Sequence, residues 1–108
     1  MRTTSARKLI RKMVDRIVKK FDPEAIILFG SHARGEGGPD SDVDLLVVMA
    51  VEGSKQEARL QIRRALRDIR IPKDGVVSRT DEFAWRKEVV GTIEYPAARE
   101  GDVLYAKR

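Results

Sequence analysis

The sequence has no cysteine, a single histidine and a single tryptophan, and aromatic residues make up only 6% of it. The absence of cysteine excludes disulfides, thiolate catalysis and cysteine-based zinc sites, and it favours a reducing compartment. With His32 alone, a histidine-based metal site is also not expected. No apolar run approaches the ~20 residues that cross a membrane. We therefore expect a soluble cytoplasmic protein with no membrane partner.

The 108 residues suffice for one hydrophobic core, so we expect residues 1–108 to form a single domain. Such a domain is too small to enclose a large acceptor molecule. The net charge is +5, and most of the excess comes from the first twenty residues. A basic helix face can bind nucleic acid or an acidic partner, but it is more often only solvated, and no aromatic residues are interleaved here for base stacking. Nucleic-acid binding is therefore an alternative, not the favoured prediction.

The pattern of apolar residues predicts four helices and four strands, separated by glycine- or proline-containing breaks. Three- and four-residue apolar spacings predict the helices, and short, largely apolar runs predict the first two strands. The fold class is therefore α/β (α+β), with a small mixed sheet of three to four strands flanked by helices. The predicted helices are 5–21, 54–69, one beginning at 80 and 92–99, and the predicted strands are 25–29, 43–48, 74–78 and 103–105.

One polar motif follows the first apolar strand, and another stands at the start of the second. Gly30 and Ser31 follow the first strand, where backbone N–H groups and a hydroxyl can bind phosphate oxygens. Asp42 and Asp44 stand at the start of the second strand, and their spacing of two places both carboxylates on the same side. Arg34 adds positive charge nearby, although an ion pair with a neighbouring acid would also explain it. Together these residues predict a metal-dependent phosphate site.

The connections between strands predict a third carboxylate at this site. A loop without a helix joins the first two strands, which favours an antiparallel pair with Ser31 near the two aspartates. A helix joins the second and third strands, which favours a parallel crossover and brings Asp74 to the same edge. Three adjacent carboxylates repel one another unless cations bind, and Mg²⁺ prefers such oxygen ligands. We expect Asp42, Asp44 and Asp74 to hold two Mg²⁺ ions that support an in-line displacement at phosphorus. We also expect Asp74 to accept the proton of the attacking hydroxyl group.

The segments Gly30–Gly35 (GSHARG) and Ser41–Leu45 (SDVDL) resemble the hallmark of the minimal nucleotidyltransferases in the DNA polymerase β-like superfamily. Later segments are similar to that family's downstream pattern, so the resemblance covers nearly the whole chain. It implies the polymerase β-like nucleotidyltransferase fold and Mg²⁺-dependent transfer of a nucleoside monophosphate from a triphosphate. It also implies that Asp42, Asp44 and Asp74 are catalytic, metal-binding carboxylates. Gly30, Ser31, Arg34 and Ser41 are expected to bind the nucleotide.

Small proteins of this family resemble the antitoxin half of a two-component pair whose toxin is a helical HEPN-domain ribonuclease. The resemblance implies ATP as the substrate and adenylylation of a tyrosine on that partner. Two alternatives stay open. One is a non-catalytic module that neutralises a toxin by covering it, and the other is a nucleotidyltransferase acting on a small molecule such as an aminoglycoside.

Overall fold

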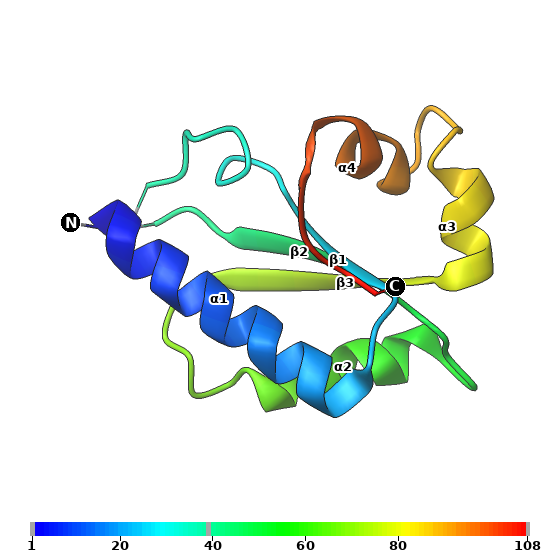
Figure 1. Ribbon diagram of the computed structural model, residues 1–108, viewed down its shortest axis with the longest axis horizontal. Coiled ribbons are helices and arrows are strands. Elements are labelled where there is room, and N and C mark those ends of the chain that lie inside the picture. The colour runs from blue at the N-terminus through cyan, green and yellow to red at the C-terminus, as the bar shows by residue number, and fades with distance from the viewer. Residues whose placement is uncertain (1, 39, 108) are drawn as a thin grey trace.

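The computed structural model describes residues 2–38 and 40–107, and within them helices and strands alternate in a mixed α/β arrangement (Figure 1). This is the fold class that the sequence predicts. The elements are α1 (Arg2–Phe21), β1 (Ala25–Phe29), β2 (Val43–Met49), α2 (Lys55–Ala65), β3 (Lys73–Arg79), α3 (Thr80–Arg86), α4 (Glu94–Glu100) and β4 (Asp102–Ala106). No helix in the described ranges combines the length and apolarity needed to cross a membrane.

The sheet has the strand order β3-β2-β1-β4. β1 and β2 pair antiparallel and β2 and β3 pair parallel, which confirms both predicted connections. β4 pairs antiparallel with β1, with a register irregularity between Ile26 and Ile27, and it forms one edge of the sheet. β2 is therefore central, and all of its residues except Asp44 are buried.

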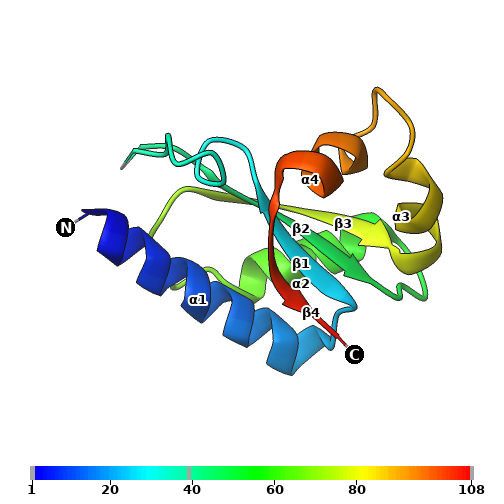
Figure 2. The same cartoon turned by 45° about the horizontal axis from the view of Figure 1, so that its top comes forward.

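Helices cover both faces of the sheet, with α1 and α2 on one side and α3 and α4 on the other (Figure 2). The first face packs against the apolar stripe of α1, which includes Met13 and Ile17, and against Ile62 of α2. The second face is smaller and packs against Ala97 of α4 and Phe83 of α3. Alternate residues of β1 and β2 serve the two cores, as the two-residue period of a strand requires.

The end of α2 differs from the prediction. α2 ends at Ala65 instead of Ile69, and the Arg16 guanidinium of α1 binds the Ala65 carbonyl at 2.9 Å, satisfying a group at the helix end. α3 begins at Thr80, as predicted, and Arg79 occupies its N-cap position. On α3, the side chain of Trp85 is 57% exposed.

Candidate active site

The end of β1 and the beginnings of β2 and β3 meet at one edge of the sheet. Phe29 pairs with Asp44 across the antiparallel ladder, and Asp44 pairs with Asp74 across the parallel ladder. Gly30 follows Phe29 directly, so the glycine, Asp44 and Asp74 stand side by side across three strands. The predicted convergence of these backbone positions is confirmed.

Gly30 is the tightest point of this edge. Its φ is +79°, and a Cβ placed there would overlap Oδ2 of Asp44 and lie 3.3 Å from Cγ. The backbone turns sharply after it, because the N–H groups of Ala33 and Arg34 both donate to the Gly30 carbonyl, at 3.1 and 3.2 Å. A side chain at Gly30 would displace either the turn or the Asp44 carboxylate.

Hydrogen bonds between its own residues hold the conformation of the loop between β1 and β2. The Gly38 N–H donates to Oγ of Ser41 at 3.1 Å, and Nε2 of His32 lies 3.2 Å from the Ser41 carbonyl oxygen. Gly37 lies against the His32 ring, where an added Cβ would be 2.5 Å from Nδ1. His32 and Ser41 thus fix the shape of the loop. The predicted contact of Ser41 with nucleotide remains a prediction.

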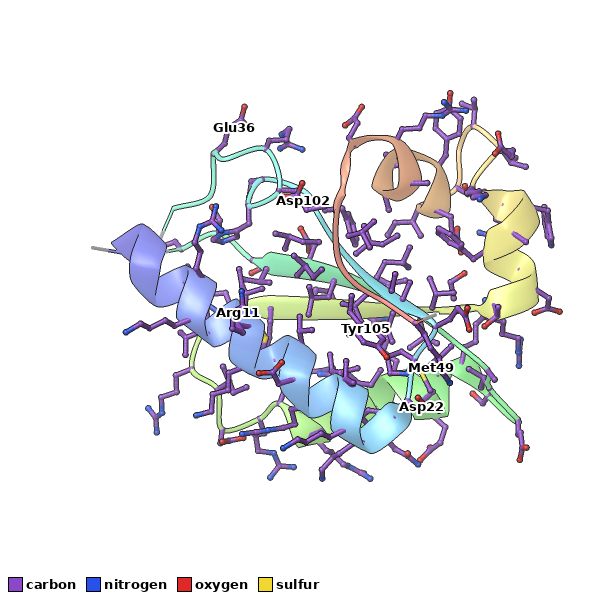
Figure 3. The ribbon with its side chains drawn as sticks, viewed as in Figure 1. Arg11, Asp22, Glu36, Met49, Asp102 and Tyr105 are labelled. Atoms are coloured by element: carbon purple, nitrogen blue, oxygen red, sulfur yellow. The ribbon has the colours of Figure 1, made fainter. Side chains whose placement is uncertain are left out.

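Arg34 lies on the exposed part of the same loop. Its Nε donates to Oε1 of Glu36 at 3.1 Å, and both side chains are at least half exposed. Figure 3 shows Glu36 projecting from the outer part of the loop. An exposed ion pair of this kind contributes at most about 1 kcal/mol, so a phosphate group can compete for the arginine.

The electrostatics of the edge are set by its carboxylates. Burial raises the pKa of Asp44 above its ordinary value of 3.8, and the charges of Asp42 and Asp74 raise it further, while His32 opposes them. Asp44 therefore carries an unfavourable negative charge at neutral pH. A divalent cation between the carboxylates would relieve that repulsion, so the donor set fits Mg²⁺.

The three carboxylates do not converge on one point. Asp42 is exposed, and Asp74 turns to α2, where Nη2 of Arg59 donates to its Oδ1 at 2.7 Å. Among residues 2–38 and 40–107, no group of three or more acidic or histidine side chains is placed to hold a metal ion. The edge thus places Asp44 and Asp74 in register, while the Asp74 carboxylate is paired with Arg59.

Arg59 is a residue that the sequence reasoning missed. It lies fifteen positions before Asp74 on a different element, and no local motif connects the two. Only the packing of α2 against β3 brings the guanidinium to the carboxylate. The sequence offers one signal for this contact, a basic residue on the helix that precedes Asp74. This helix has several basic residues, so the signal does not single out Arg59.

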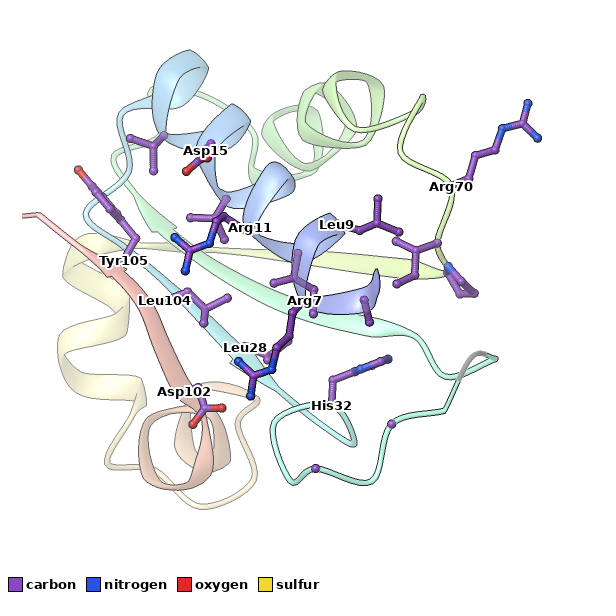
Figure 4. A pocket seen from close by; sticks show the side chains of 18 of the residues that line it. Arg7, Leu9, Arg11, Asp15, Leu28, His32, Arg70, Asp102, Leu104 and Tyr105 are labelled. Atoms are coloured by element: carbon purple, nitrogen blue, oxygen red, sulfur yellow. The ribbon is translucent and has the colours of Figure 1, made fainter. Parts of the chain in front are cut away.

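A groove of about 1340 Å³ lies between α1 and β4 (Figure 4). His32 and the loop glycines form one end, and Arg7, Arg11 and Tyr105 line its length. None of the three aspartates lines it. This groove therefore borders the loop, while the carboxylates occupy the open edge of the sheet.

Comparison with known proteins gives a family match and a shared fold. The family model described as "Nucleotidyltransferase domain" matches residues 10–97. A crystal structure from Sulfolobus solfataricus, provisionally described as a nucleotidyltransferase, has a TM-score of 0.64 and 23% identity, and covers 93% of this chain and 79% of that one. This likeness shows the fold alone.

A crystal structure of a toxin–antitoxin with AMP-PNP has a TM-score of 0.48 and 20% identity. The match covers 100% of this chain and 76% of that chain. None of the curated proteins compared with the chain matches it.

Proposed function

The chain belongs to the nucleotidyltransferase domain family, and from this premise we propose that it transfers a nucleoside monophosphate from a triphosphate to a hydroxyl group. Residues 1–108 form the single catalytic domain in this proposal. The observation that carries it is the edge at which Gly30, Asp44 and Asp74 stand side by side. A phosphate-binding turn beside carboxylates that favour a cation is the arrangement that this chemistry requires.

The residues of the loop bind and orient the triphosphate in this proposal. The Gly30 turn and the Ser31 hydroxyl donate to phosphate oxygens, Arg34 exchanges Glu36 for a phosphate group, and Ser41 lies beside them. These contacts hold the leaving pyrophosphate in line with the incoming hydroxyl.

Asp42, Asp44 and Asp74 would together hold two Mg²⁺ ions. When bound, the metal neutralises the negative charge of the phosphates and the leaving pyrophosphate. The chain supplies a turn that leaves room for the Asp44 carboxylate and a second strand that presents Asp74 beside it.

The transfer step is a displacement at the α-phosphorus. The acceptor hydroxyl oxygen forms a bond to that phosphorus, and the bond from phosphorus to the oxygen bridging the α- and β-phosphates breaks. Pyrophosphate leaves with the electron pair of that bond. The hydroxyl proton passes to the carboxylate of Asp74, whose Oδ1 is the oxygen that Arg59 engages.

We further propose that ATP is the donor and that the acceptor is a tyrosine of a helical HEPN-type toxin, which gives the chain an antitoxin role in the cytoplasm. Exposed apolar side chains support a protein partner. Trp85 and Val90 are 57% and 77% exposed, and Val89 and Ile93 are exposed in the same stretch between α3 and α4. Exposed aromatic and aliphatic side chains of this kind favour contact with another protein.

The test uses ATP labelled on the α-phosphate, Mg²⁺ and lysate of the native host. We expect a labelled protein band with the wild type and no band with the folded double variant Asp42→Asn, Asp44→Asn. Normal labelling by that variant would overturn the assignment of the two aspartates.

Co-expression with the toxin separates the antitoxin role from a binding role. Catalytic neutralisation requires that the double variant no longer protects the cell. Protection that survives the double substitution would instead support the non-catalytic module. Transfer to an aminoglycoside, without any labelled protein, would replace the protein acceptor by a small molecule.

A further inference from the structure

The positive charge of this chain is concentrated in two segments. Residues 6–21 hold seven lysines and arginines against one aspartate, and residues 55–70 hold six against two acids. These 32 residues thus carry an excess of ten positive charges, while the whole chain carries +5. The rest of the chain, including the aspartate edge, has a net charge of −5.

The two basic segments lie on the same side of the sheet. α1 and α2 pack into one core, and Arg16 of α1 binds the Ala65 carbonyl and the Asp68 carboxylate at the end of α2. Figures 1 and 2 show both helices on the face opposite α3 and α4. The sequence shows two basic segments, and the fold places them side by side.

Most of this charge has no acidic partner. Within the described residues, Arg16, Lys55 and Arg59 form ion pairs, whereas ten other basic residues of the two segments form none. All ten are exposed. We call these ten residues the basic face: Arg7, Lys8, Arg11, Lys12, Lys19, Lys20, Arg63, Arg64, Arg67 and Arg70.

The composition of the basic face distinguishes between classes of partner. Protein interfaces need a desolvated apolar centre, and Leu60 is the sole exposed large apolar residue described on α1 and α2. Single-stranded nucleic acid needs aromatic side chains for stacking, and the one aromatic residue of these helices, Phe21, packs against the core. A regular phosphodiester backbone needs only an array of lysines and arginines.

We propose that the basic face binds the phosphate backbone of a nucleic-acid duplex. From Lys8 to Lys19, α1 extends about 17 Å, over which a double helix presents roughly ten phosphates. The contacts would be independent of base sequence. None of the ten residues is proposed to bind the nucleotide or the metal, so the inference does not depend on the proposed nucleotidyl transfer.

The test measures fluorescence anisotropy of labelled DNA and RNA duplexes, each about two helical turns long. We expect the full chain to bind a duplex at about 50 mM salt and to lose affinity steeply toward about 200 mM. The double variant Lys12→Gln, Arg64→Gln removes one charge from each helix. It should reduce the slope of log K against log salt by about 1.8 on DNA, at about 0.9 for each phosphate contact.

The matched control is Lys87→Gln, Lys107→Gln, which removes the same charge outside the basic face. The control should keep the wild-type slope, and circular dichroism should show that both variants are folded. An equal loss of slope in the control would overturn the proposal. So would the absence of duplex binding at about 50 mM salt, or equally tight binding of polyglutamate, which carries charge without phosphates.

Discussion

The Asp44 carboxylate lies directly against Gly30, in the space that a Cβ at Gly30 would occupy. The glycine also has a φ of +79°, a conformation that costs other residues about 1–2 kcal/mol. The turn that is proposed to bind phosphate and the carboxylate that is proposed to bind Mg²⁺ are thus fitted to each other. A substitution that alters the turn should therefore also displace the carboxylate, and the reverse.

The substitution Gly30→Ala tests this fit. We expect a loss of about 2–4 kcal/mol in the free energy of unfolding, because the strain of the positive φ adds to the overlap with Asp44. Gly35→Ala is the matched control, since Gly35 has a φ of +76° and nothing within 4 Å of an added Cβ. The control should lose only about 1–2 kcal/mol. Urea denaturation measures both, and equal losses would show that the Asp44 contact contributes nothing.

Asp44 should also make stability depend on pH. Burial, Asp42 and Asp74 raise its pKa, so the folded protein holds the proton more tightly than the unfolded chain does. The contribution of Asp44 to stability therefore falls as the pH rises from the ordinary value of 3.8 through the raised pKa, and the full penalty from this group applies at neutral pH.

Asp44→Asn removes this penalty. We expect a higher Tm at neutral pH, and a difference that shrinks as the pH falls toward 3.8. Glu52→Gln, a change of equal charge at an exposed loop residue, serves as the control in the same thermal scans. A gain that does not depend on pH would contradict the account of Asp44.

The Arg59 ion pair should oppose metal binding. Arg59→Gln frees the Asp74 carboxylate, and we expect Mg²⁺ to bind up to about fivefold more tightly, the equivalent of the ~1 kcal/mol of an exposed ion pair. Arg63→Gln, one turn further along α2, removes the same charge and leaves the Arg59–Asp74 ion pair in place. Isothermal titration calorimetry compares the two variants. Equal affinities in both would show that Asp74 takes no part in cation binding.

A buried network should hold α4 to the rest of the domain. Glu94 is 3% exposed, and it accepts hydrogen bonds from Oγ of Ser78 at 2.9 Å and from Nε of Arg86 at 3.0 Å. Glu94→Ala should cost about 1–3 kcal/mol, because the buried Ser78 hydroxyl and the partly exposed Arg86 guanidinium lose their acceptor. Glu88→Ala, at the exposed pair with Arg99, should cost about 1 kcal/mol or less. Similar costs in chemical denaturation would refute the structural role of Glu94.

The sequence predicted much of this edge because the signals are local. The apolar run Ala25–Phe29 and the two connections determine the strand directions, and those directions place Asp44 beside Asp74. The sequence could not predict the contact between Arg59 and Asp74, or that the basic residues of α1 and α2 lie on one surface. Both depend on how helices pack, which the order of residues along one element does not determine.

The central claim is that the chain transfers a nucleoside monophosphate, and it is tested most directly by comparing ATP labelled on the α-phosphate with ATP labelled on the γ-phosphate. Each is incubated with the protein, Mg²⁺ and host lysate, beside the Asp42→Asn, Asp44→Asn variant. The account predicts that the acceptor takes up the α-label alone, and only with the wild type. Uptake of the γ-label would show phosphoryl transfer instead, and no uptake of either label by a folded, ATP-binding protein would contradict the claim.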